Sequence, residues 1–188
     1  MELRFYDLRG LFAKTVMDYF TGEYLRGATP NPCIVCNRDI KFGALLDIAL
    51  NEGIDYIATG HFAKIEKSEN RWLLRKSESE KDQSYFLYML SQNQLAHAVF
   101  PLGDMTKQAV RDIALASGMP VAQKPDSLEV CFVPDNDYAS FIHRYCGLAE
   151  TQGNFIDTRG NVLGHHKGII RYTIGQRKGL GAFGQPKY

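Results

Sequence analysis

Asp55-Tyr56-Ile57-Ala58-Thr59-Gly60-His61 is the stretch of sequence that decides the fold. Its first five residues form a short, largely apolar run, and a glycine follows directly. Because a helix-like segment precedes the run, it predicts a buried strand of a parallel sheet, and hence a fold of the α/β class. Ligands of open α/β sheets bind beyond the carboxyl ends of such strands. We therefore expect Gly60 and His61 to face a binding site.

Helices and a loop are predicted before this strand. Apolar residues recur at helical spacing over residues 38–50, which predicts a helix that Gly53 ends. Residues 27–37 contain one glycine, two prolines and two asparagines, and they predict a loop. A further short amphipathic helix is predicted over residues 15–25.

Hairpins and short helices are predicted after the strand. Residues 62–66 and 71–75 have the pattern of a hairpin. Thr106 is a candidate N-cap for a helix over residues 108–117, and another helix is predicted over residues 137–145. Beyond that helix the sequence becomes glycine-rich and β-like, beginning with a hairpin. These changes predict three parts, namely residues 1–80, 81–150 and 151–188.

The composition is that of a globular protein. Hydrophobic residues make up 45% of the 188 residues, enough to bury a core in one or two domains. The formal net charge is +1, so any contact with nucleic acid must come from local basic patches. The opening residues contain no apolar signal-peptide region, and no apolar run is long enough to span a bilayer. We expect a cytoplasmic protein with no membrane partner.

The four cysteines are too few for a secreted disulfide scaffold. Cys33 and Cys36 form a C-x-x-C pair on the predicted loop, just before a helix whose positive N-terminal potential favours thiolates. Such a pair suits a nucleophile or a metal ligand, although the second pair that a structural zinc site would need is missing. Lys124 would favour a thiolate at Cys131 if the two lie close in space. On their apolar surroundings alone, Cys131 and Cys146 are candidates for core packing.

Five blocks of sequence carry a family resemblance. They are residues 27–42 (GATPNPCIVCNRDIKF), 55–61 (DYIATGH), 81–87 (KDQSYFL), 126–132 (DSLEVCF) and 174–181 (IGQRKGLG). In this order they resemble the bacterial tRNA-specific 2-thiouridylase family (MnmA/TrmU). Because the blocks cover most of the chain, the resemblance is far more specific than any single motif.

The resemblance implies a fold and a reaction. The fold would be a PP-loop (adenine nucleotide alpha hydrolase-like) domain, followed by a small mixed or helical central domain and the start of a β-barrel. Mg-dependent ATP would adenylate O2 of the wobble uridine of a tRNA. By matching position, Cys131 would carry a persulfide, and Cys36 would be the nucleophile that releases the sulfur and forms a transient disulfide with Cys131. The partners would be tRNA and a sulfur donor, either a cysteine desulfurase or a sulfur-relay protein.

The resemblance also implies binding residues. Gly60 would let the nucleotide approach the backbone closely, and His61 would contact the tRNA. The remaining expected contacts are those of Asn31, Pro32 and Cys33 with the target base, and of Lys81, Asp82 and Gln83 with the tRNA. Two plainer interpretations stay open. In the first, His61 is a hydrogen-bonded structural histidine at the end of a strand. In the second, residues 81–83 form a solvated loop in which Asp82 caps the next helix.

Two features depart from the family pattern. The family's ATP loop of the Ser-Gly-Gly-Val-Asp-Ser type does not occur, and most of its C-terminal β-barrel is missing, so we expect a truncated chain that is inactive alone. Many members also carry Asp where this chain has Cys33, which argues against acid/base catalysis by that residue. The cysteine suggests an alternative mechanism, in which Cys33, Cys36 and Cys131 hold an iron–sulfur cluster that binds the transferred sulfide.

Two other functional classes stay open. Another PP-loop ATP pyrophosphatase, such as an amidotransferase or a ligase, would share the nucleotide site but would not need cysteines in two separated segments. A non-catalytic RNA-binding or zinc-binding module is the third class, although the net charge and the single C-x-x-C pair give it little support.

Overall fold

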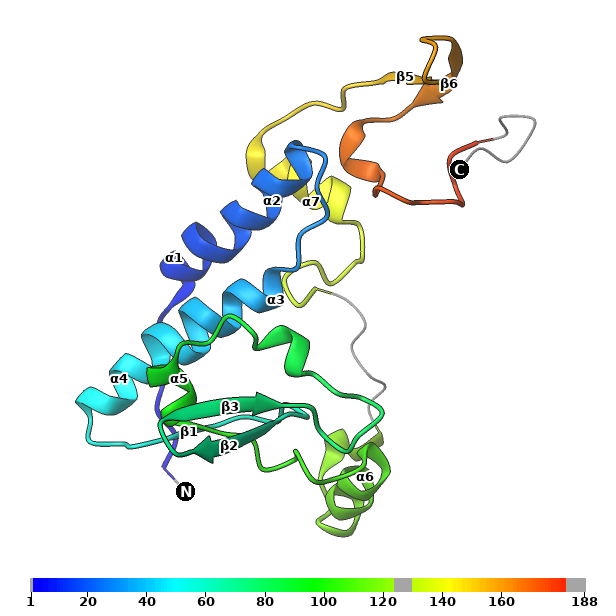
Figure 1. Cartoon of the computed structure of the whole chain (residues 1–188). Coiled ribbons are helices and arrows are strands. Elements are labelled where there is room, and N and C mark those ends of the chain that lie inside the picture. The colour runs from blue at the N-terminus through cyan, green and yellow to red at the C-terminus, as the bar shows by residue number, and fades with distance from the viewer. Residues whose placement is uncertain (1, 124–129, 182–188) are drawn as a thin grey trace. The chain divides into compact units, whose positions relative to one another are not determined.

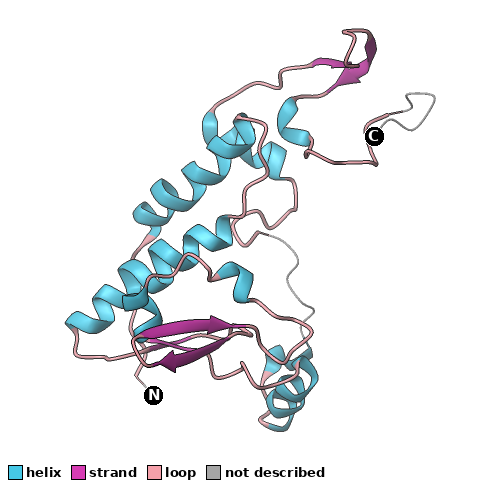
Figure 2. Cartoon of the chain, viewed as in Figure 1, coloured by secondary structure: helices cyan, strands magenta, loops and turns pink. Residues whose placement is uncertain are grey.

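The chain divides into two compact units. The computed structural model describes residues 2–123 and 130–181 (Figure 1). Unit 1 comprises Met1–Thr15 and Cys33–Ser127, and unit 2 comprises Val16–Pro32 and Leu128–Tyr188. The described strands form three two-stranded sheets, drawn in magenta in Figure 2, and no barrel closes within this part of the chain. The three-part division at residues 80 and 150 stays a prediction.

The first helical run is longer than predicted. It consists of α1 (Arg9–Phe12), a π-helical segment η1 (Ala13–Met17) and α2 (Asp18–Leu25), so the helix predicted over residues 15–25 begins earlier. The division between the units falls inside this run. Val16, Phe20 and Tyr24 are buried, and their spacing of four places them along one face of the helix.

A second helical run carries the C-x-x-C pair and corrects one prediction. It consists of α3 (Pro32–Val35), the π-helical η2 (Cys36–Ala44) and α4 (Leu45–Asn51). The loop predicted over residues 27–37 therefore ends at Asn31. Pro32 starts the helix rather than stiffening a loop, because its fixed φ angle suits a first helical position where no N–H is needed. Gly53 has a φ of +79° and ends the run, as predicted.

Unit 1 contains the parallel strand pair that the opening stretch predicts. β1 (Ile57–Ala58) pairs in parallel with β4 (Ala98–Val99). The prediction of burial is wrong, because Tyr56 is 59% exposed and Ala58 is exposed. Within the described residues β1 has only β4 as a neighbour, so its other edge has no covering strand.

A hairpin and the second helical run enclose the core of unit 1. β2 (Lys64–Ser68) and β3 (Arg71–Arg75) form the predicted antiparallel hairpin, and α5 (Gln92–Ala96) packs beside it (Figure 1). A short 3₁₀ turn, η3 (Ser84–Phe86), lies between them in sequence. The buried core consists of Phe42, Ala63, Leu87, Leu90, Leu95, Ala98 and Phe100. Phe42 comes from the helical run, so the segment with the cysteines is anchored in this core.

The last part of unit 1 is helical. α6 (Lys107–Ala116) begins at Thr106, whose side chain accepts a hydrogen bond from the N–H of Ala109, so the predicted N-cap is confirmed. A 3₁₀ turn, η4 (Pro120–Gln123), follows.

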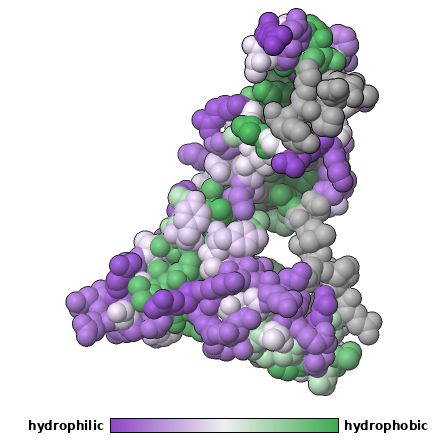
Figure 3. All heavy atoms as spheres, turned by 45° about the vertical axis from the view of Figure 1, so that its right-hand side comes forward, coloured by the Kyte–Doolittle hydropathy of each residue, from purple (hydrophilic) through white to green (hydrophobic). Residues whose placement is uncertain are grey.

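The visible face of the molecule is mostly hydrophilic, interrupted by smaller hydrophobic patches (Figure 3). No helix within residues 2–123 and 130–181 is long and apolar enough to cross a membrane.

Unit 2 is built around α2 and α7 (Tyr138–Cys146). Its buried core consists of Phe20, Tyr24, Val133, Ala139, Ile142 and Ile170. After α7 come an antiparallel hairpin of β5 (Gly153–Ile156) and β6 (Val162–His166), and then a 3₁₀ turn, η5 (Ile169–Arg171). The predicted helix over residues 137–145 and the predicted hairpin are thus both present.

Candidate functional site

Cys33 and Cys36 lie in the first two turns of the second helical run. Residues three apart project from the same face of a helix, so the two thiols are neighbours on that face. Cys33 is exposed and Cys36 is half-buried. The start of a helix exposes backbone N–H groups that favour negative charge, which suits a thiolate there.

Asn37, directly after Cys36, tethers this helix to the following segment. Only 1% of Asn37 is exposed, and its Nδ2 donates a hydrogen bond to the backbone oxygen of Phe86 at 3.2 Å. Segment 84–90 therefore runs beside the cysteine helix (Figure 1). The Oδ1 atom of Asn37 is buried without a hydrogen-bond partner. Buried acceptors without a partner are rare in folded proteins.

Gly60 lies where the binding site is predicted. The N–H of Thr59 continues the parallel ladder by donating to the oxygen of Val99 at 3.1 Å, and Gly60 follows it, exposed. A Cβ atom built on Gly60 would lie 3.7 Å from Leu102 Cδ1, an ordinary contact. Packing within the chain does not require glycine here, so the position leaves room for a ligand close to the backbone.

His61 is held as a neutral side chain. Its Nδ1 lies 2.7 Å from the hydroxyl oxygen of Thr59, and its ring packs with centroids 6.4 Å from Phe42 and 5.9 Å from Phe100. Burial, helped by the charge of Lys41, lowers the pKa of His61 to about 4. An uncharged imidazole can stack or exchange hydrogen bonds, but it does not neutralise phosphate at pH 7.

Gln83 joins segment 81–83 to the strand end. The N–H of Phe62 donates to Gln83 Oε1 at 3.0 Å, and the N–H of Gln83 donates to the Phe62 oxygen at 2.7 Å. Phe62 follows His61 directly. The structure therefore brings segment 81–83 close to Gly60 and His61, about 20 residues earlier in the sequence.

Asp82 and Lys81 differ in what they offer a ligand. Asp82 accepts hydrogen bonds from the N–H of Ser77 at 2.8 Å and from the hydroxyl of Ser84 at 2.7 Å. Its carboxylate thus holds the loop, but the expected cap is wrong, because the N-cap residue of η3 is Gln83 and no side chain caps it. Lys81 is exposed, and its backbone N–H is fixed by Ser79 Oγ at 3.1 Å. Of the three residues, Lys81 is the best placed to meet a phosphate.

Cys131 is exposed in unit 2. Its apolar neighbours take the core positions instead, since Val133 is buried and Phe132 packs against the same cluster. The interpretation of Cys131 as a core cysteine is therefore wrong. Cys146 is half-buried and packs against this core, as predicted. Lys124, expected to act on Cys131, lies outside the described residues.

The three residues expected at the target base straddle the division between the units. Asn31 and Pro32 belong to unit 2, whereas Cys33 begins the second stretch of unit 1. Pro32 is buried, Asn31 is half-buried and Cys33 is exposed. Cys33, and to a lesser degree Asn31, are the members that a base could reach.

The described residues do not assemble a metal centre. Within residues 2–123 and 130–181, no three His, Cys, Asp or Glu side chains are grouped so that they could hold a metal ion. Cys33 and Cys36 belong to unit 1 and Cys131 to unit 2. The iron–sulfur mechanism therefore stays an alternative hypothesis.

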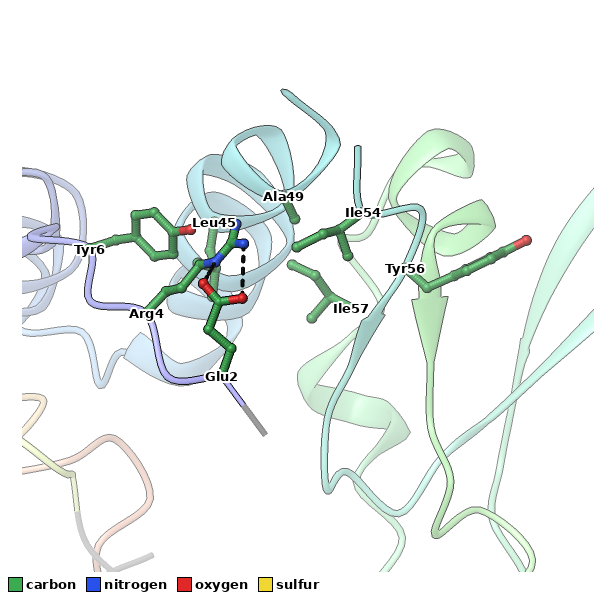
Figure 4. Close-up of a pocket in the computed structure, with 8 residues that line it drawn as sticks. All are labelled: Glu2, Arg4, Tyr6, Leu45, Ala49, Ile54, Tyr56 and Ile57. Atoms are coloured by element: carbon green, nitrogen blue, oxygen red, sulfur yellow. Dashed lines mark hydrogen bonds and ion pairs between the residues drawn. The ribbon is translucent and has the colours of Figure 1, made fainter. Parts of the chain in front are cut away.

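Two cavities lie away from the predicted residues. One, of about 380 Å³, is lined by residues near the start of β1 and by the N-terminal segment, where Arg4 pairs with Glu2 (Figure 4). The other, of about 230 Å³, lies in unit 2 and is lined partly by His143 and His166. Neither is lined by any of the residues predicted at the site.

Two residues of the site escaped the sequence interpretation. Asn37 sits inside a helix, where its tether to Phe86 depends on tertiary contact. Gln94 reaches the cysteine helix from α5, with its Nε2 2.8 Å from the backbone oxygens of Arg38 and Phe42. The spacing of Ser91 and Gln94 does carry the signature of a capping box, but that signature says nothing of contacts to another helix.

Comparisons with known proteins place the chain in a family context. Residues 1–135 match the model of the tRNA methyl transferase HUP domain, and residues 139–188 match that of the tRNA methyl transferase PRC-barrel domain. A protein of Clostridioides difficile (strain 630) named tRNA-specific 2-thiouridylase is 54% identical over 186 residues, which cover 97% of this chain and 52% of the relative. Proteins of the same name from Treponema denticola and Clostridium acetobutylicum are 53% and 56% identical, over 97% and 91% of this chain and 52% and 48% of the relatives. The chain thus spans about half the length of the curated relatives it matches.

Proposed function

Because the chain belongs to the family of the tRNA methyl transferase HUP domain, whose matched relatives are tRNA-specific 2-thiouridylases, we propose that this protein replaces O2 of a tRNA uridine with sulfur. The family resemblance further suggests that the uridine is the wobble base and that the reaction uses ATP. Such a reaction needs reduced thiols, which agrees with the expected cytoplasmic location.

The observation that carries this proposal is the exposure of Cys131. Its neighbours Phe132 and Val133 pack against the core, yet the thiol itself is kept at the surface. A cysteine that only fills space would be buried, as free cysteines usually are. An exposed thiol is available to receive sulfur from a donor protein and to pass it on.

Cys36 is assigned the second role in sulfur transfer. With a persulfide on Cys131, the Cys36 thiolate attacks the inner sulfur, which is the Sγ of Cys131. The sulfur–sulfur bond of the persulfide breaks, a disulfide forms between Cys36 and Cys131, and hydrosulfide leaves. The hydrosulfide then attacks C2 of the activated uridine and expels the leaving group on O2. A thiol reductant restores both cysteines, and the donor, a cysteine desulfurase or a sulfur-relay protein, reloads Cys131.

The nucleotide is assigned to the carboxyl end of β1. When bound with Mg²⁺, ATP supplies the chemistry that turns O2 of the uridine into an adenylate leaving group. The exposed Gly60 fits close approach of a nucleotide because packing within the chain does not need a glycine there. The neutral His61 is assigned a hydrogen-bonding or stacking contact with the tRNA.

The remaining contacts with tRNA are assigned to two segments. Lys81 is assigned a phosphate contact, while Asp82 and Gln83 hold the loop that presents it. Cys33 and Asn31 are assigned to the target base, and Pro32 between them begins the helix. A uridine of the anticodon loop must leave its stack to reach such a site, which single-stranded loops permit at low cost.

The decisive experiment is nucleoside mass spectrometry of tRNA from a thiolation-deficient strain that carries the complete gene. We expect the wild-type gene to restore 2-thiouridine and the Cys131→Ser variant not to restore it. Cys146→Ser is the matched control, because Cys146 lies in the same unit but packs against the core. If the wild-type gene restores no 2-thiouridine while it is expressed and soluble, the proposal is wrong, and another PP-loop ATP pyrophosphatase becomes the function to test.

A further inference from the structure

The helix that carries the cysteines is broken just downstream of them. Inside η2, Gly43 has φ −98° and ψ −105°, which is not a helical conformation. The N–H of Leu45 donates to the oxygen of Ile40, five residues back, so the turn is wider than in an α-helix. A Cβ atom on Gly43 would lie 2.9 Å from the oxygen of Arg38, too close for any residue other than glycine.

Gln94 is bonded to both sides of this break. Its Nε2 donates to the oxygen of Arg38 and to the oxygen of Phe42, each at 2.8 Å. In a regular α-helix the N–H groups four residues further on would use these two oxygens. Gln94 thus supplies a side-chain donor to two carbonyl groups next to a distorted turn.

The Gln94 side chain is itself held in place. Its Oε1 accepts from the N–H of Ser91 at 2.9 Å, and its own N–H donates to Ser91 Oγ at 3.2 Å, forming the capping box of α5. α5 in turn buries Leu95 in the core of unit 1. The Gln94 amide therefore ties the cysteine helix to the core of unit 1, in addition to the packing of Phe42.

We propose that Gln94 is a positioning residue for Cys36, an inference that rests on the proposed function. Arg38, one of its two acceptors, lies only two residues beyond Cys36. The attack of Cys36 on a persulfide needs the sulfurs aligned, and the resulting disulfide tolerates only a narrow range of Cα separations. By fixing the break, Gln94 holds the half-turn that bears Cys36 in one direction, while the tether of Asn37 to Phe86 supports it from the next residue.

The test uses Gln94→Glu in the complete enzyme. The carboxylate keeps the acceptor for Ser91 and hence the capping box, but it loses the donor to Arg38 and Phe42. Gly43→Ala disturbs the same break from inside the helix and serves as the second variant. The matched control is Gln92→Glu on the same helix, because Gln92 forms a similar pair of bonds, but to the backbone of Trp72.

Three quantities are measured for each variant. They are the single-turnover rate of tRNA thiolation, the rate of AMP and pyrophosphate release without a sulfur donor, and the site-resolved alkylation rate of Cys36 relative to Cys146. We expect Gln94→Glu and Gly43→Ala to slow thiolation roughly 10- to 100-fold, as misalignment of reacting atoms does. Adenylation and tRNA affinity should stay near wild type, and the alkylation rate of Cys36 should change while that of Cys146 does not. Gln92→Glu should leave thiolation and Cys36 alkylation near the wild-type values.

Two results would overturn the inference. One is an equal effect of Gln92→Glu and Gln94→Glu, which would show general destabilisation. The other is an unchanged alkylation rate of Cys36 in both Gln94→Glu and Gly43→Ala. Failure of the proposed function gives a different result, because the wild-type enzyme would then form no 2-thiouridine. The effect of Gln94 on the alkylation of Cys36 does not depend on that activity.

Discussion

Gln83 and Phe62 exchange a reciprocal pair of hydrogen bonds, with Phe62 N to Gln83 Oε1 at 3.0 Å and Gln83 N to the Phe62 oxygen at 2.7 Å. The pair resembles one rung of a sheet, except that one acceptor is a side chain. Because Phe62 directly follows His61, these two hydrogen bonds hold the loop that carries Lys81 close to the carboxyl end of β1. Gln83 thus contributes, together with Asp82, to the spacing between the expected nucleotide site and the expected phosphate contact.

Substitution of Gln83 separates its structural role from a contact with RNA. Gln83→Leu leaves the buried Phe62 N–H without an acceptor and should lower the free energy of unfolding by about 1–3 kcal/mol. Gln83→Glu keeps the acceptor, so its unfolding free energy should be near that of the wild type. Urea unfolding measures both, and tRNA affinity is measured in parallel. Normal stability with strongly weakened binding in Gln83→Glu would instead indicate a direct contact of Nε2 with RNA.

His61 should make the stability of the fold depend on pH on the acid side. Its folded pKa, about 4, lies below the usual value of 6.5. Between these values the unfolded chain binds a proton that the folded chain does not, so stability is lost as the pH falls from 6.5 towards 4. The urea midpoint of His61→Gln should fall less steeply over this range than that of the wild type. The control is His97→Gln, a substitution of the same kind in the same unit. An NMR titration in which His61 protonates near pH 6.5 would refute the burial argument.

A single turnover without reductant should trap a disulfide. After reaction of persulfide-loaded enzyme with tRNA and ATP, peptide mass spectrometry under non-reducing conditions should find Cys36 bonded to Cys131, in proportion to the 2-thiouridine formed. The Cys36→Ser variant should form none and should retain the persulfide on Cys131. Thiolation without any loss of free thiol at these two positions would contradict the assigned roles.

Cys33→Asp discriminates between the persulfide and the iron–sulfur mechanisms. In the persulfide mechanism Cys33 only lies against the base, so we expect the variant to retain most of the thiolation rate. In the cluster mechanism a ligand is lost, and iron, sulfide and activity should decline together. Iron and acid-labile sulfide are measured on the complete protein purified without oxygen, beside the wild type. Stoichiometric iron in the wild type that disappears in the variant would favour the cluster.

Local signals in the sequence predicted much of the fold. The hairpin of β2 and β3 has its turn at Glu69-Asn70, and α6 has its Thr106 cap, so neighbours in sequence decide both elements. The parallel pairing of β1 was also predicted correctly. Its exposure was not, because burial of a strand depends on what covers it, and the sequence of the strand does not encode that.

The errors at the candidate site have one physical cause, which is that contacts between segments distant in sequence decide the local structure there. Prolines and asparagines favoured a loop around Cys33, whereas Pro32 starts a helix there. Cys131 had apolar neighbours and was a candidate for the core, but Phe132 and Val133 fill that role. The bonds of Gln94 and Asn37 join segments about 50 residues apart, and no local pattern predicts such pairing.

The interleaving of the two units has a consequence for synthesis on the ribosome. Val16–Pro32 belongs to unit 2 but is made before nearly all of unit 1. Phe20 and Tyr24 pack against Val133 and Ile142, which are made more than a hundred residues later. At the usual rate of translation this apolar helix face waits on the order of ten seconds for its partners. During that interval it is a natural substrate for chaperones, and a nascent chain stalled before residue 128 would keep that face exposed.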